Sequence, residues 1–200
     1  MTPAPPVACP VVRRAGVWAA LTVAVLAMSG LHLVQLELSP WHEPVSFYVH
    51  GPHGWLFTVA LASFGAAAVL LGDSWRHDTG TRGRWALLLF GTAMLIVAVV
   101  PSDPFFPWEA DPSGSGLVHA GLSVVAPPLL LWPMWRRRAA ASPLGRRWAG
   151  FNRWVYGVSL VASGASLLVG WLHGGPPPAI GVAERVLAWA AVGWMTWAAA

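Results

Sequence analysis

The chain has 200 residues, of which 56% are hydrophobic and 10% are charged, and its mean hydropathy is +0.57. Soluble domains carry about 25% charged residues, so this composition excludes an ordinary soluble protein and indicates an integral membrane protein. The formal net charge is +4, and the placement of the arginines along the chain accounts for it without a nucleic-acid partner.

Six apolar segments are long enough to cross a hydrocarbon core about 30 Å thick, which takes roughly 17 to 25 helical residues. The first segment also resembles a signal peptide because Arg13 and Arg14 precede it, but its apolar run is longer than an ordinary h-region. The last is the weakest because Glu184 and Arg185 lie in its first turn. The six segments are residues 15–36, 53–72, 85–101, 117–135, 154–172 and 182–200.

These segments predict an all-α fold, an integral membrane bundle of six transmembrane helices. A single six-helix domain covers residues 15–200, and residues 1–14 form a disordered cytoplasmic tail that contains the only cysteine, Cys9. Pro127 and Pro128 fall inside the fourth segment, and two consecutive prolines remove two backbone donors, so we expect that helix to bend there.

The arginines predict how the bundle is oriented, because short loops rich in Lys and Arg stay in the cytoplasm. With the N-terminus inside, eleven of the twelve basic residues fall in the inner connections, and Arg185 is the exception. Both termini are then cytoplasmic, and the loops at 37–52, 102–116 and 173–182 are outside. We expect a multi-pass protein of the cell membrane whose partners are membrane lipids, with anionic lipid at the inner loops.

Ionisable residues gather near the outer ends of the predicted helices, whereas none lies at mid-membrane depth, which argues against an ion-coupled transporter. They are open to three interpretations: helix caps and interfacial residues, a metal site, or a polar pocket for a ligand such as a lipid headgroup. Neutral imidazoles with a carboxylate suit zinc, although no closely spaced ligand pair is present. The candidate metal ligands are His53, Asp103, His119 and His173.

Four stretches in order along the chain resemble a bacterial six-helix membrane family catalogued as domain of unknown function 998. They are "PVSFYVHGPHGWLFTVAL" after the first segment, "VPSDPF" closing the third, "SGSGLVHAGLSVVA" opening the fourth and "GVAERVLAWAAVGW" opening the last. The resemblance implies six helices and a candidate site, but no established reaction. The plan is more distantly similar to the eukaryotic stress-linked autophagy modulators and GPI-remodelling factors, which would favour a lipid-related or regulatory role.

The first outer loop concentrates polar side chains, and Pro40 and Pro44 restrict its backbone. We expect it to fold over the helix ends as a lid. Interfacial anchoring by its aromatic residues is the alternative. Groups at the bilayer edge avoid lipid by turning inward, so Ser46, Tyr48, Asp103, His119 and Glu184 are predicted to converge on one outward-facing pocket. The candidate ligand-binding residues are Ser46, Tyr48, His53, Asp103, His119, Glu184 and Arg185.

Two function classes remain open. The first is a non-catalytic protein that binds a lipid-like or small ligand in a sensory or scaffold role. The second is a membrane-embedded hydrolase or transferase, metal-dependent or not, that uses Asp103 and His119 on a lipid-like substrate. No motif is diagnostic of a reaction, so the first class is preferred.

Overall fold

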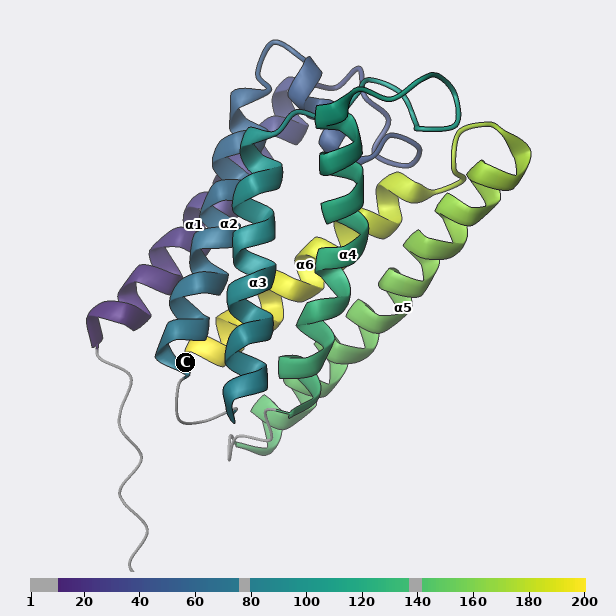
Figure 1. Cartoon of the computed structure of the whole chain (residues 1–200). Coiled ribbons are helices and arrows are strands. Elements are labelled where there is room, and N and C mark those ends of the chain that lie inside the picture. The colour runs from purple at the N-terminus through teal and green to yellow at the C-terminus, as the bar shows by residue number, and fades with distance from the viewer. Residues whose placement is uncertain (1–10, 76–79, 137–141) are drawn as a thin grey trace, which may run out of the picture.

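The computed structural model describes residues 11–75, 80–136 and 142–200, and these contain seven helices and no strand (Figure 1). The expected tail at 1–10 and Cys9 lie outside the described residues, whereas residues 11–14 are already helical. The elements are α1 (Val11–Val34), the short 3-10 helix η1 (Val45–His50), α2 (Trp55–Ser74), α3 (Gly80–Val99), α4 (Gly114–Arg136), α5 (Pro143–His173) and α6 (Ile180–Ala199).

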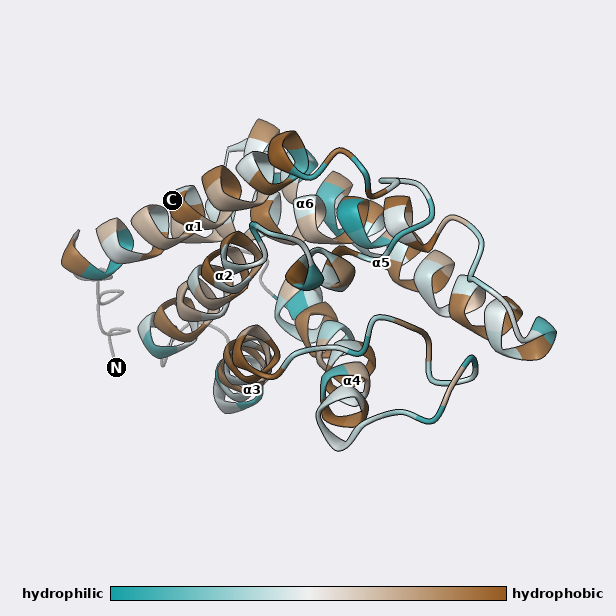
Figure 2. Ribbon diagram, turned by 90° about the horizontal axis from the view of Figure 1, so that it is seen from above, coloured by the Kyte–Doolittle hydropathy of each residue, from teal (hydrophilic) through white to brown (hydrophobic). Residues whose placement is uncertain are grey.

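Five of the helices, α1 to α5, are long and apolar enough to cross a membrane. Large hydrophobic side chains remain exposed along them, such as Leu26 at 66% and Val161 at 72%. Soluble proteins rarely expose a continuous apolar surface of this kind, whereas lipid covers it at no cost. Hydrophobic residues accordingly occur along all the long helices, and hydrophilic residues gather in the loops (Figure 2). The chain is therefore a multi-pass membrane protein.

The helix α6 runs diagonally across the bundle, from the end of α5 to the N-terminal part of α1 (Figure 1). Its side chains contribute heavily to one core that all six long helices share, with Trp194 and Met195 fully buried. Trp194 packs edge-on against Trp75, which directly follows α2, with ring centroids 5.6 Å apart. Because protein surrounds much of α6, it tolerates polar residues that a lipid-facing helix would exclude. This explains why the weakest apolar segment occupies a central position.

Glycines allow a close contact between α2 and α3. A Cβ atom at Gly65 would lie 2.8 Å from the carbonyl oxygen of Gly91, and one at Gly91 would lie 2.7 Å from that of Gly65. Real Cβ atoms do not approach so closely, so each position accepts only glycine without a shift of the backbone. Small residues let membrane helices pack this tightly in the absence of a hydrophobic driving force between them.

One helix begins well before the segment that the sequence predicts, and another contains the expected prolines. α5 begins at Pro143, eleven residues before the predicted apolar segment, because Ser142 caps it by accepting a hydrogen bond from the Gly145 amide at 3.2 Å. Its first turns are polar, so hydropathy alone missed them. α4 continues as one helix through Pro127 and Pro128, and the Tyr156 hydroxyl donates to the Pro127 carbonyl at 2.8 Å. The bend expected at these prolines stays a prediction.

The helices alternate in direction, so the bundle has two distinct ends. We call the end that holds η1 and the loops 35–54, 100–113 and 174–179 the loop end. The opposite end holds the start of α1, α3 and α5 and the end of α2, α4 and α6, and we call it the arginine end. Arg185 is the only arginine of the described chain at the loop end, as the sequence predicts.

Candidate functional site

Arg185 docks the first turns of α6 against the first loop. Its Nε donates to His32 Nε2 at 2.7 Å, and its Nη1 donates to the carbonyl oxygens of Glu43 at 3.0 Å and Gly181 at 2.8 Å. Its guanidinium carbon lies 5.3 Å from the centre of the buried Tyr48 ring, in the geometry of a cation–π contact. The arginine therefore joins α1, η1 and α6.

The hydrogen bonds of His32 define its protonation. Nδ1 lies 2.7 Å from the Met28 carbonyl oxygen, which can only accept, so Nδ1 carries the proton. Nε2 accepts from Arg185 and is therefore unprotonated. The ring is neutral, in a single tautomer, and it lies 5.0 Å from the Tyr48 ring. This arrangement lets a histidine and an arginine share a confined space without repulsion.

Glu184 provides a second link between α6 and the first loop, because its Oε2 accepts a hydrogen bond from the Val45 amide at 2.9 Å. Val45 starts η1, so this carboxylate lies at the N-terminus of that short helix. The backbones also approach closely here. A Cβ atom at Gly181 would lie 2.6 Å from the Glu43 carbonyl oxygen and 2.7 Å from that of Pro40. Gly181 is thus required for the contact.

Gln35 holds the other side of η1. Its side chain is fully buried just beyond α1. In the amide orientation that satisfies both ends, the nitrogen donates to the Tyr48 carbonyl at 3.2 Å and the oxygen accepts from the His53 amide at 3.1 Å. We call His32, Gln35, Tyr48, Glu184 and Arg185 the loop-end cluster. It ties the first loop to α1 and α6.

Asp103 belongs to a second group, at the N-terminus of α4. Its two carboxylate oxygens accept from the Ser113 amide at 2.9 Å and the Ser113 hydroxyl at 2.7 Å. The Ser113 hydroxyl in turn accepts from the Gly116 amide at 2.9 Å, as an N-cap does. A Cβ atom at Gly116 would collide with the Asp103 carboxylate. The capping interpretation of Asp103 therefore accounts for its contacts.

His119 lies one turn further along α4 and is 3% exposed. Its Nδ1 lies 2.6 Å from the Val100 carbonyl oxygen and donates to it, whereas Nε2 has no hydrogen-bond partner in the described structure. Nearby, the Ser102 hydroxyl lies 3.3 Å from both the Ser46 carbonyl oxygen and His50 Nε2. The loop 100–113 thus connects to η1 through Ser102.

The predicted site residues consequently share the loop end but divide into neighbouring groups. Tyr48, Glu184 and Arg185 meet in the loop-end cluster. Asp103 accepts from Ser113, the N-cap residue of α4, whereas His119 donates to Val100, so within the described residues the two side chains have different partners. Ser46 contributes its backbone carbonyl. His53 and His173 have exposed side chains.

The four candidate metal ligands do not form a metal-binding group. Across residues 11–75, 80–136 and 142–200, no three His, Cys, Asp or Glu side chains lie close enough together to hold a metal ion. Asp103 and His119 each bond to backbone or hydroxyl groups within the protein, and His53 and His173 lie on the surface. The side-chain arrangement thus offers no basis for placing zinc here.

A hollow between α5 and α6, adjoining the loop end, was not expected from the sequence. It has a volume of about 200 Å³ and a mostly apolar wall. Ala179, in this wall, has a φ of 56°, in the left-handed region that non-glycine residues rarely adopt. Only the small residues of the two helices hinted at it. The lining residues are Val158, Ser159, Ala162, Pro178, Ala179, Val182, Ala183 and Val186.

Sequence reasoning also missed Gln35 and gave His32 no role. The available signal was their position, three residues apart at the end of the first apolar run, where a buried polar side chain needs a partner. The partners of Gln35 are the backbone groups of Tyr48 and His53, and the partner of His32 is the Arg185 side chain, 153 residues away. Pairing of this kind is visible only in the fold.

Comparison with known proteins places the chain in a family without assigning an activity. No similar protein was found among curated proteins, and no similar fold was found among solved structures. A family model described as "Protein of unknown function (DUF998)" matches residues 15–200, which include every helix from α2 to α6 and most of α1. The resemblance seen in the four sequence stretches is confirmed, and the chain belongs to the DUF998 family.

Proposed function

We propose that this protein is a non-catalytic, six-span membrane protein that binds a lipid-like ligand in the hollow between α5 and α6 and signals through α6. The observation that carries the proposal is the hollow itself. Its wall is mostly apolar, and Val158 and Val186 on its rim are 60% and 39% exposed. In a bilayer, a surface of this kind meets acyl chains.

The size of the hollow favours a lipid acyl chain that is held from one side over a small molecule that is fully enclosed. Its volume of about 200 Å³ is smaller than the roughly 300 to 1,000 Å³ of pockets that enclose small molecules. Ala179 contributes a strained backbone to the wall, and strain of this kind costs about 1 to 3 kcal/mol and clusters at functional sites. Both features fit a groove that holds one lipid chain from the side.

The proposed topology places this hollow in the outer leaflet. α6 has 20 residues, which extend about 30 Å at 1.5 Å per residue, enough for a sixth crossing. The arginine end is cytoplasmic by the positive-inside rule, so both termini are cytoplasmic and the loop end is outside. Pro178 and Ala179 precede α6 at the loop end, so the ligand would come from the outer half of the bilayer.

A sensory role follows from the two faces of α6. Val182, Ala183 and Val186 line the hollow, whereas Glu184 and Arg185 bond to the first loop. A chain that enters the hollow would bear on the same helical turns that hold η1. Occupancy would therefore change how firmly the first loop is docked, and the loop is the part of this unit that an external partner could reach.

The hollow can be tested with two tryptophan substitutions on α5. Ala162→Trp fills the hollow, whereas Ala165→Trp adds the same side chain to an exposed position of the same helix outside its wall. We expect native mass spectrometry of the purified protein to show a retained lipid in the unsubstituted protein and in Ala165→Trp, but not in Ala162→Trp. Equal lipid retention by the two variants would contradict the proposal.

The sensory step needs a separate measurement. We expect hydrogen exchange of the amides at 45–50 to differ between lipid-loaded and delipidated protein, and this difference should disappear in Ala162→Trp. Amides of α2 and α3, far from the hollow, serve as the internal control. If the exchange rates of the amides at 45–50 in the unsubstituted protein are the same with and without lipid, the lipid site has no sensory role.

One observation favours the alternative, a membrane-embedded hydrolase or transferase. His119 Nε2 is buried and has no partner among the described groups, so its lone pair or proton is available to a substrate, as a general base or acid requires. Release of product from phospholipid vesicles by the unsubstituted protein, lost in His119→Gln, would support this alternative. Absence of product from both would support the non-catalytic function.

A further inference from the structure

The arginine end of α4 and α5 has an unusual charge distribution. Between Asp111 and Glu184 the sequence contains six arginines and no acidic residue. Arg136 closes α4, and Arg147 and Arg153 lie in the first turns of α5. Charges of one sign on adjacent helices repel unless an anion lies between them or they stay fully hydrated.

Two of these arginines lie over tryptophan rings. The guanidinium carbon of Arg136 lies 4.9 Å from the centre of the Trp132 ring on the same helix. That of Arg153, on α5, lies 5.5 Å from the centre of the Trp135 ring on α4. Stacking covers one face of each guanidinium and leaves its N–H edges available, the edges that bind phosphate in a bidentate manner.

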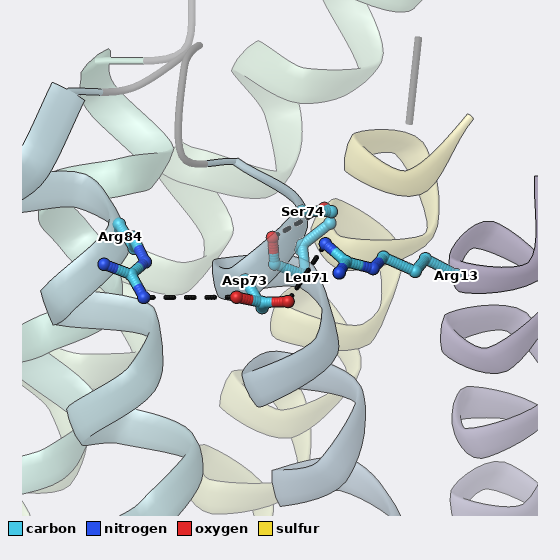
Figure 3. A network of polar contacts seen from close by, with 5 residues as sticks. All are labelled: Arg13, Leu71, Asp73, Ser74 and Arg84. Carbon is cyan, nitrogen blue, oxygen red and sulfur yellow. Dashed lines mark hydrogen bonds and ion pairs between the residues drawn. The ribbon is translucent and has the colours of Figure 1, made fainter. Parts of the chain in front are cut away.

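The arginines at the other side of the same end are used differently. Arg13 Nη1 lies 3.0 Å from one Asp73 carboxylate oxygen, and Arg84 Nη2 lies 4.0 Å from the other (Figure 3). One carboxylate thus joins α1, α2 and α3. Among the described residues no ion pair joins Arg136 or Arg153 to a carboxylate, and α4 and α5 themselves contain no acidic residue.

Exposed aromatic side chains surround the stacked arginines. Trp135 is 56% exposed and Phe151 is 60% exposed. Trp148 donates from Nε1 to the Gly193 carbonyl at 3.3 Å, which anchors this part of α5 to α6. α5 has 31 residues, about 46 Å at helical rise. A hydrocarbon core about 30 Å thick therefore leaves its first turns at headgroup depth, where tryptophan is favoured.

We infer that Arg136 and Arg153, stacked on Trp132 and Trp135, form a binding site for the headgroup phosphate of an anionic phospholipid. The surplus of positive charge supplies the attraction, the stacked guanidinium edges supply the donors, and the tryptophans contact the upper part of the acyl chains. The site lies at the opposite end of the bundle from the hollow between α5 and α6, so it stands independently of the function proposed above.

The test compares matched charge removals in nanodiscs. The lipids bound to the protein are identified by native mass spectrometry after extraction from nanodiscs of mixed phosphatidylglycerol and phosphatidylcholine. Arg153→Gln removes a stacked arginine, whereas Arg82→Gln removes an exposed arginine of α3 at the same end. We expect phosphatidylglycerol enrichment to fall about fivefold in Arg153→Gln, as loss of one basic residue near an anionic surface predicts, and to be unchanged in Arg82→Gln.

Two further arms separate a built site from general attraction. Trp132→Leu with Trp135→Leu keeps every charge but removes the stacking, and we expect it to lower enrichment as well. Inorganic phosphate in the buffer should not displace the lipid. Equal enrichment in the Arg153 and Arg82 variants, no effect of the tryptophan substitutions, or displacement by inorganic phosphate would each overturn the inference. Circular dichroism of each variant checks that its helices remain intact.

Discussion

The two ends of the bundle satisfy their arginines in different ways. At the loop end, Arg185 bonds to a neutral histidine and to two backbone carbonyls, and its face rests on Tyr48. At the arginine end, Arg13 and Arg84 share the Asp73 carboxylate, whereas Arg136 and Arg153 rest on tryptophans. The Arg185 guanidinium is buried among protein groups, and of its nitrogens Nη2 lacks a partner in the described residues, whereas the last arrangement leaves donors available at the surface.

The few acidic residues of the protein are used mainly for contacts within the fold. Asp103 binds the N-cap residue of α4, Glu184 binds η1 and Asp73 joins three helices, so these three carboxylates serve internal contacts. A buried charged group and its hydrogen-bond partners stabilise the fold only together, because removal of one of them leaves the others buried and unpaired. A solvated ion pair contributes much less. Substitutions at the loop end should therefore cost more than substitutions at the arginine end.

The largest expected effect is that of Arg185→Gln. It removes the donors to His32, Glu43 and Gly181, which leaves buried acceptors unpaired, and we expect the free energy of unfolding to fall by about 3 kcal/mol. Reversible unfolding in mixed detergent and SDS measures this. Arg82→Gln, an exposed arginine, should change stability by less than about 0.5 kcal/mol. Similar losses in both variants would break the comparison between the ends.

A smaller loss is expected from Gly181→Ala. The added methyl group would lie 2.6 to 2.7 Å from the carbonyl oxygens of Glu43 and Pro40, and backbone yields less than a side chain. Overpacking of this kind costs about 1 to 3 kcal/mol. Gly164→Ala is the control, because its Cβ would meet nothing within 4 Å and alanine is the better helix former. A Gly181→Ala variant as stable as Gly164→Ala would show that α6 is not docked to the first loop.

Next in size is Gly116→Ala, which would push the Asp103 carboxylate away from Ser113. The cost should be about 1 kcal/mol, the value of a helix cap, since a side chain can move aside. In an Asp103→Ala background the same substitution should cost little, so the double-mutant cycle isolates the contact. Gly121→Ala, with no neighbour within 4 Å of its Cβ, should be neutral or stabilising. Additive losses in the cycle would argue against the contact.

The smallest expected effect is that of Asp73→Asn at the arginine end. Its partner Arg13 is 43% exposed at the side chain, so we expect a loss of about 0.5 to 1 kcal/mol. Added salt should lower the free energy of unfolding of the unsubstituted protein toward that of Asp73→Asn, because salt screens exposed ion pairs. The contribution of Arg185 to the free energy of unfolding should change little with salt. Salt-dependent unfolding of both proteins measures this. A salt-independent loss above that of Arg185→Gln would reverse the proposed ranking.

Much of the fold was predictable from the sequence, and the candidate site was predictable in part. The all-α class, the long apolar helices and the family follow from hydropathy and four short stretches, because a segment in lipid must satisfy its backbone within a helix. Arg185 lies over the Tyr48 ring and Glu184 binds the Val45 amide of the same short helix, whereas the pocket predicted at these residues stays a prediction. The sequence missed the polar first turns of α5, because their helical character depends on the Ser142 cap and on tertiary contacts such as that of Trp148 with Gly193.

The sequence by itself determined which residues avoid water and which end carries the arginines, because both depend on local composition. Only the tertiary structure decided which polar groups pair. His32 and Arg185 are 153 residues apart. Asp103 accepts a hydrogen bond from Ser113, and His119 donates one to Val100. Each choice depends on which acceptor lies within about 3 Å once the helices have packed. The missing side chains of Gly116 and Gly181 let Asp103 and the first loop approach α4 and α6 this closely.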